Sequence, residues 1–197
     1  MSLWGATDSD ESKPKNLTTA EKKEVFATSK GWVREAGSIQ SGNDNTSATP
    51  EVLVAIGDLQ TALGAADITS IDWITTTADK SAGFTLSATL RFNEAVDVVT
   101  TGGTPTLAVT NGNQGSGTGR GPHALAYTSG TGTNELVFSL AIAAANAATN
   151  EDDVLVFGAN PLALNSGTIK DAGTSTNATI TSVAGIGTAA GSITVVA

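Results

Sequence analysis

The chain has 197 residues, of which 40% are hydrophobic, and it carries a formal net charge of −9 at pH 7. This length suits one sizeable domain with an appendage, or two small domains. The acidic balance weighs against a nucleic-acid-binding protein, which needs clustered Lys and Arg to neutralise phosphates. Cysteine is absent, so a disulfide framework and a thiolate metal site are both excluded.

The distribution of charge and apolar residues indicates where the protein is made and how it is divided. The N-terminus lacks the basic start and apolar run of a secretory signal, and apolar runs such as residues 52–56 are too short to span a bilayer. We therefore expect synthesis in the cytoplasm and no membrane partner.

Residues 1–80 hold seven of the ten basic and twelve of the nineteen acidic side chains. The remaining residues are thus much poorer in charge, and this change in composition predicts an N-terminal arm over residues 1–67 and a domain over residues 68–197.

The arm is expected to be extended, with a small α/β element. Thr18 or Thr19 is suited to cap a helix that ends near Gly31. Residues 41–50 have the composition of a linker, residues 51–56 predict a buried strand, and residues 58–64 predict a helical turn that stops at Gly64.

Large apolar side chains in the arm have little local core to enter. Two explanations remain open for them. In the first, these side chains form an interface with another protein, as aromatic anchors flanked by basic residues often do. In the second, they pin the arm to its own domain. The candidate contact residues are Leu3, Trp4, Phe26, Trp32, Val33 and Arg34.

From residue 68 onward the sequence alternates strictly between apolar and polar positions. Residues 84–92 are the clearest case, because every second side chain is apolar and the others are mainly hydroxyl-bearing or charged. Turn sequences rich in Gly, Asn and Ser separate the predicted strands. Seven to nine short strands over about 120 residues favour an all-β, two-sheet sandwich of the immunoglobulin-like kind. The expected strands are residues 68–76, 84–92, 96–100, 106–110, 124–128, 135–142, 154–157, 179–183 and 192–196.

The sequence offers few residues for chemistry. His123 is the only histidine, and it is expected at the start of a strand without a nucleophile beside it. Residues 151–153 (Glu-Asp-Asp) are a weak calcium motif, for which a solvated turn is the favoured explanation. The Gly-rich residues 112–121 resemble a phosphate-binding loop only superficially, because a strand and not a helix follows them. We expect no catalytic, cofactor-binding or metal-binding residues, and hence no enzyme.

Four ordered strings in the C-terminal part resemble the immunoglobulin-like repeat domains of large bacterial and phage surface proteins. The resemblance covers roughly residues 68–183 and implies the sandwich fold, with a role as spacer, adhesive module or decoration. The strings are residues 92–96 (Phe-Asn-Glu-Ala-Val), 103–107 (Gly-Thr-Pro-Thr-Leu), 126–138 (Ala-Tyr-Thr-Ser-Gly-Thr-Gly-Thr-Asn-Glu-Leu-Val-Phe) and 160–173 (Asn-Pro-Leu-Ala-Leu-Asn-Ser-Gly-Thr-Ile-Lys-Asp-Ala-Gly).

The N-terminal part is similar to virion proteins of tailed phages of marine bacteria, including cyanophages. The strings that carry this likeness are residues 1–5, 13–15, 26–28 with 31–33, and 51–56. The resemblance implies a capsid decoration or cement protein that is a homo-oligomer or is present in many copies on the particle. Its arm is expected to anchor on the major capsid protein or another virion protein, and the sandwich is displayed outward. It leaves open a tail or neck position, or a module that binds a host surface or glycan.

Overall fold

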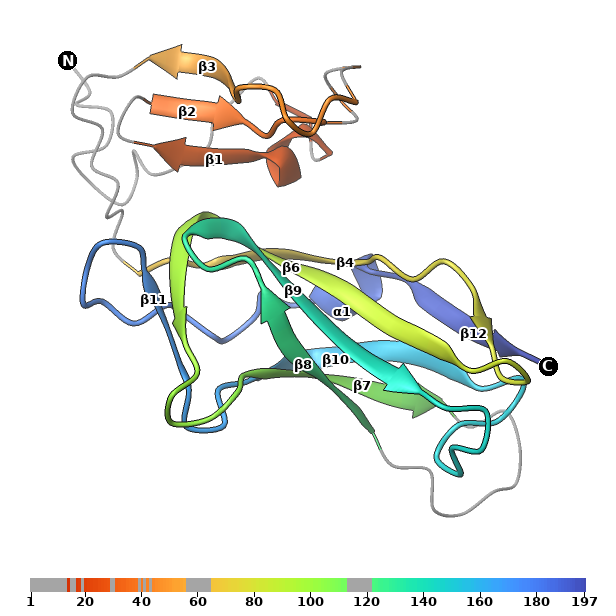
Figure 1. Cartoon of the computed structure of the whole chain (residues 1–197). Coiled ribbons are helices and arrows are strands. Elements are labelled where there is room, and N and C mark those ends of the chain that lie inside the picture. The colour runs from red at the N-terminus through yellow and green to blue at the C-terminus, as the bar shows by residue number, and fades with distance from the viewer. Residues whose placement is uncertain are drawn as a thin grey trace.

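Alternating apolar and polar side chains produce strands along most of the chain, because each such strand has one buried and one exposed face. The computed structural model describes residues 14, 17–18, 20–28, 31–38, 40, 42, 44–55, 65–112 and 122–197. In these ranges it is mostly β, with one short 3-10 helix and one short α-helix (Figure 1). In chain order the elements are η1 (Glu21–Glu24), β1 (Val25–Thr28), β2 (Gly31–Arg34), β3 (Glu51–Ala55), β4 (Ile68–Trp73), β5 (Ala78–Asp79), β6 (Phe84–Val99), β7 (Thr106–Gly112), β8 (His123–Ser129), β9 (Thr133–Ile142), β10 (Val154–Ala163), β11 (Thr168–Asp171), α1 (Ile186–Ala189) and β12 (Ser192–Val196).

The strands belong to two sheets. A small antiparallel sheet has the order β1-β2-β3, and the other nine strands form a large sheet that curls into a two-layered, sandwich-like arrangement (Figure 1). One layer contains β4, β6 and β9, and the other contains β7, β10 and β12. Strand β8 joins them, because it pairs with β7 up to Ala126 and with β9 from Ala126 onward. Strand β5 pairs in parallel with β12.

The main core lies between the two layers. It contains most of the apolar side chains that the alternation places on one face of each strand, among them Leu86, Leu90 and Phe138, which are fully buried. Burying each side chain of this size contributes roughly 1.5–3 kcal/mol before entropy is counted. Trp73 of β4 stacks on Phe157 of β10 with a ring-centroid distance of 4.1 Å, so an aromatic pair ties one layer to the other.

The small sheet has its own apolar cluster. Val25, Ala27 and Trp32 are buried in it. The expected helix is wrong beyond Glu24, because β1 begins at Val25 and forms a hairpin with β2. Cross-strand pairing of β-branched and aromatic residues outweighs the helix preference of the Ala-Glu-Lys sequence before them. The strand expected at residues 51–56 is confirmed as β3, but Val52 is 48% exposed, so the expected burial is wrong.

Two predictions in the sandwich also need correction, and two short strands were not predicted. Residues 84–92 and 96–100 were expected as two strands, yet they belong to one long strand, β6. The chain stays extended there because β6 exchanges β4 for β11 as its neighbour on one edge. Residues 179–183 do not form a strand, although Thr179 makes an isolated bridge with Asp67. Strands β5 and β11 were not predicted. No helix within the described ranges is long and apolar enough to cross a membrane.

Candidate functional site

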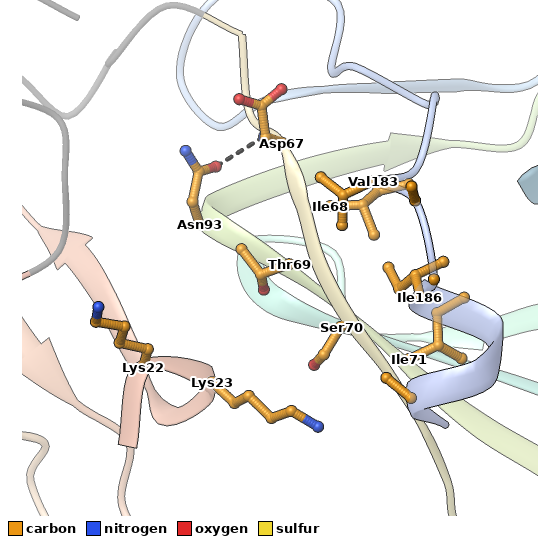
Figure 2. A pocket seen from close by; sticks show the side chains of 13 residues that line it. Lys22, Lys23, Asp67, Ile68, Thr69, Ser70, Ile71, Asn93, Val183 and Ile186 are labelled. Carbon is orange, nitrogen blue, oxygen red and sulfur yellow. Dashed lines mark hydrogen bonds between the residues drawn. The ribbon is translucent and has the colours of Figure 1, made fainter. Parts of the chain in front are cut away.

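A hollow in the described surface lies along strand β4, where the small sheet and the sandwich meet (Figure 2). Its volume is about 520 Å³, which is within the range of small-molecule and peptide sites. We call it the β4 groove. Its lining includes Lys22, Lys23, Ile68, Ile71, Val183 and Ile186.

The floor of the β4 groove is the edge of strand β4. One edge of β4 pairs with β6, and no other described strand pairs with the opposite edge beyond Asp67. The groove is closed at one end by the parallel bridge between Asp67 and Thr179. At the other end Trp73 donates its indole N–H to the carbonyl of Gly191 at 3.4 Å. Ile68, Ser70 and Ile71 of this strand are buried, at most 3% exposed, so little of its backbone is open to a ligand.

An apolar wall stands on one side of β4. It comes from the segment that includes α1, where Ile186 is buried and Val183 is 62% exposed. Gly185 starts α1 with a φ of +82°, a conformation that glycine adopts without strain. Gly187 lies so close to strand β10 that an added Cβ would be 2.2 Å from the Phe157 carbonyl oxygen. The wall is therefore fixed against the sandwich by close backbone packing.

The turn η1 stands on the other side of β4, and Figure 2 shows the Lys23 side chain directed toward β4 and the Lys22 ammonium directed away from it. A capping box fixes the start of this turn. The Glu21 N–H donates to Thr18 Oγ1 at 3.2 Å, and the Thr18 N–H donates to a Glu21 carboxylate oxygen at 2.8 Å. Lys23 Nζ lies 3.3 Å from Asp72 Oδ1 on β4, which places the lysines beside the sandwich. Thr18 thus bonds with Glu21 as expected, but the N-cap residue of η1 is Ala20, which makes no side-chain cap bond, so a helix capped directly by Thr18 is not formed.

Four of the predicted contact residues lie in described strands of the small sheet. Trp32 is 0% and Val33 4% exposed, so both are covered within the chain. Val33 pairs with Phe26, and Phe26 lines a smaller hollow with Glu35 and Asn134 at the junction with the sandwich. These positions agree with the explanation that such side chains pin the arm to its own domain. A contact role for them stays a prediction.

The other two predicted contact residues, Leu3 and Trp4, lie outside the described residues. Arg34 is partly exposed and forms ion pairs with two carboxylates of its own unit, Glu21 at 3.2 Å and Glu51 at 3.7 Å. Arg34 thus stabilises the small sheet and leaves part of its surface to solvent.

A charged network joins the small sheet to the sandwich. Arg91 on β6 is its centre and forms ion pairs with Asp72 at 3.3 Å, with Glu35 at 3.8 Å and with Glu135. The Asn134 side-chain N–H donates to Glu35 at 2.7 Å. Burial, and then the charge of Glu135, raise the pKa of Glu35 to about 7, against the opposing effects of Asn134 and Arg91.

His123 lies in a buried polar cluster and not at an open site. It is 5% exposed, and its Nε2 lies 2.8 Å from the hydroxyl of Thr149, which is 0% exposed. Burial lowers the pKa of His123, and the charge of Asp153 opposes this shift. Asp153 thus lies near enough to His123 to affect its charge, although the two residues are far apart in the sequence. A substrate has no access to side chains this deeply buried, so the cluster is suited to structural support.

Residues 151–153 divide between surface and interior. Glu151 and Asp152 are exposed, as expected for a solvated turn, whereas Asp153 is 0% exposed and accepts a hydrogen bond from the Asn150 N–H at 2.8 Å. In the described part of the chain, no three His, Cys, Asp or Glu side chains gather as metal ligands. The Gly-rich residues 113–121 lie outside the described residues.

The β4 groove thus combines the edge of strand β4, an apolar wall and a lysine that is paired with Asp72. No sequence motif marks this groove, because its walls come from three distant segments of the chain. Searches against family models, curated proteins and solved structures found no match to the chain.

Proposed function

We propose that this chain is a virion structural protein, most simply a capsid decoration or cement protein of a tailed phage. In this proposal the N-terminal part anchors on the major capsid protein, and the sandwich projects outward. The observation that carries the proposal is the two-part build, in which a small N-terminal sheet has an apolar cluster separate from the sandwich core. The resemblance of the N-terminal strings to phage virion proteins supports the same division.

The order of strands supports an immunoglobulin-like identity for the sandwich. In such domains the first, second, fifth and fourth strands form one sheet, and the third, sixth and seventh form the other. Here β4, β6, β9 and β8 pair in that order, and so do β7, β10 and β12. The chain departs from antibody domains in having no disulfide, no tryptophan on β7, and a β8 that pairs with both layers. The proposal therefore concerns topology and not an antibody-like core.

The anchor in this proposal belongs to the N-terminal unit. Leu3 and Trp4 supply apolar contacts and Arg34 supplies charge, while Trp32, Val33 and Phe26 hold the small sheet in shape. In this proposal many copies of the protein together stabilise the capsid shell mechanically. Each copy that binds the assembled shell and not its separated subunits stabilises the shell by mass action, and a copy that bridges two subunits gains from effective concentration.

The test is binding of the full-length protein to empty shells assembled from the major capsid protein of the same phage. We expect the chain to co-sediment with shells, and we expect Leu3→Ala/Trp4→Ala to lose occupancy at least tenfold, about 1.4 kcal/mol. Lys170→Ala, on β11 of the sandwich, is the matched surface control and should bind like the parent. Full occupancy by the double variant would exclude this anchor.

Imaging of the labelled protein on whole particles separates the head from a tail or neck position. Label confined to the tail would replace the decoration role with a tail component. A host-glycan module is disfavoured because Tyr127, the only tyrosine, packs edge-on against Phe138 and accepts a hydrogen bond from the Thr131 N–H. It is therefore not a free aromatic platform for a sugar.

A further inference from the structure

We propose that the junction between the small sheet and the sandwich is a pH-sensitive latch, which holds the two units together in mildly acidic solution and releases them from one another as the pH rises through neutrality. The juxtaposition that carries the proposal is that of two carboxyl groups from opposite sides of the junction, Glu35 and Glu135, at the guanidinium group of Arg91. The proposal goes beyond the anchoring role above, because it concerns the contact between the two units of this chain and requires no shell.

The junction depends on side chains and not on a continuous sheet. No described strand of the small sheet pairs with a described strand of the sandwich, although β1 lies next to β6 (Figure 1). Polar contacts that cross the junction include those of Lys23 with Asp72 at 3.3 Å, of Glu35 with Arg91 at 3.8 Å, and of Asn134 with Glu35 at 2.7 Å. Because two of these contacts involve the carboxyl group of Glu35, its ionisation acts directly on the junction.

The charges at the latch do not balance when Glu35 is ionised. The carboxylates of Glu35, Glu135 and Asp72 then share Arg91, and Lys23 is the second cation of the group through its contact with Asp72. Three negative charges thus face two positive ones, and the excess disappears when Glu35 takes up a proton. The O–H group of a protonated Glu35 is also a donor for the neighbouring Glu135 carboxylate.

The other charged side chains next to Glu35 are engaged elsewhere. Glu24, whose backbone carbonyl accepts the Glu35 N–H at 2.8 Å, directs its carboxylate to the Ser38 hydroxyl. Arg34, which precedes Glu35 in the chain, forms ion pairs with two other carboxylates of its own unit. Neither residue therefore compensates the charge of an ionised Glu35.

The surroundings of Glu35 determine the direction of the effect. Its side chain is 15% exposed and lies with Phe26 and Pro50 at the smaller hollow of the junction. Burial, and then the charge of Glu135, raise the pKa of Glu35 to about 7, whereas its ordinary value is 4.5. Release removes the sandwich from one side of Glu35 and exposes its carboxyl group to water.

The proton linkage gives the size of the effect. Because the pKa of Glu35 is higher in the docked state, docking takes up a proton, so docking is strongest below pH 4.5 and weakens as the pH rises through about 7. Each pKa unit is a factor of ten in the linked equilibrium, so the ratio of docked to released molecules falls on the order of 100-fold between pH 4.5 and about pH 8. A junction that favours docking by less than this factor is mostly released above neutrality.

The experiment measures the distance between the two units in the purified full-length protein. The chain has no cysteine, so Ser47→Cys and Ala124→Cys, at exposed positions of the two units, accept nitroxide labels for distance measurement by electron paramagnetic resonance. We expect one narrow distance distribution at about pH 5.5, and a second, broader population that grows as the pH is raised to about 8.5. The control pair Ala124→Cys/Ser192→Cys lies within the sandwich and should give the same distance at every pH.

Three substitutions in the labelled protein test which group is the proton acceptor. Glu35→Gln keeps a polar side chain without the charge, and should lower the ratio of released to docked molecules at about pH 8.5 at least tenfold. Glu135→Gln removes the like charge that faces Glu35 and should lower the same ratio. Glu51→Gln, at a carboxylate of β3 that is 61% exposed, is the matched control and should be released like the parent.

A distance distribution of the parent that is the same at both ends of this pH range would overturn the proposal. So would equal release of the parent and Glu35→Gln, or a change within the sandwich pair, which would mean that the sandwich itself unfolds. No shell is present in this experiment, and shell binding is measured with variants of Leu3 and Trp4. Failure of the latch and failure of the anchor are therefore distinguishable.

Discussion

Replacing Glu35 by Gln removes the carboxyl with the most perturbed environment in the described part of the chain. The pKa of Glu35 lies near 7 in the folded protein, whereas its ordinary value is 4.5. Because the folded-state pKa is the higher one, folding favours the protonated form, and stability is lost as the pH rises from 4.5 through 7. With about 1.4 kcal/mol per pKa unit, the ionised group costs folding on the order of 3 kcal/mol at pH 8.

Urea unfolding of the parent and of Glu35→Gln at pH 5, 6, 7 and 8 measures this effect. The variant should gain stability relative to the parent as the pH rises, with the gain approaching about 3 kcal/mol at pH 8. Glu51→Gln removes a carboxylate of the same small sheet that is 61% exposed, and serves as the control. Hydrogen exchange of β1 and β2 amides locates the change at the junction. A difference between parent and Glu35→Gln that stays constant from pH 5 to pH 8 would refute the reasoning.

Three further changes probe the supports of the fold. Arg91→Met leaves three carboxylates without their shared cation and should cost about 2–4 kcal/mol in urea unfolding; a loss below about 0.5 kcal/mol would mean that the network adds little. Thr149→Val removes the hydrogen-bond partner of buried His123 and should cost about 1–3 kcal/mol, and unchanged stability would show that another group replaces the hydroxyl. Gly130→Ala places a Cβ 2.0 Å from the Glu135 carbonyl oxygen, whereas Gly132→Ala in the same turn meets nothing within 4 Å. The thermal midpoint should therefore fall clearly further for Gly130→Ala than for Gly132→Ala, whose cost is about 1–2 kcal/mol; equal effects would contradict the close approach.

The strands of the sandwich were predictable because each one is a local pattern. Residues 84–92 and 135–142 alternate cleanly, and both regions form strands at the predicted places, within β6 and β9. Pairing across the sheet is a long-range property and misled the prediction elsewhere. Asn93 is of a residue type that is common in turns, but β6 continues through it because the strand next to β6 changes there from β4 to β11. The alternation at residues 179–183 finds no partner strand beyond Thr179.

The hairpin of the small sheet and the β4 groove were harder to predict for the same reason. Val25 and Phe26 follow a sequence of good helix formers, and only their pairing with Val33 and Arg34 makes them a strand. Lys22, Ile68 and Val183 are far apart in the chain and ordinary in type. No local signal brings them together, and the groove is visible only when the three-dimensional arrangement is known.

The parallel pairing of β5 with β12 determines how the sandwich responds to force. Val195 and Val196 lie beside Ala78 and Asp79, and the Lys80 N–H donates to the Val196 carbonyl at 2.8 Å. When the N-terminal unit is held and the C-terminus is pulled, the load on these two strands acts along their length in opposite directions. The hydrogen bonds between them are then sheared together and not opened one after another. If the protein is held by its N-terminal part, a pulling force on its C-terminal end therefore acts in the direction in which this contact is strongest.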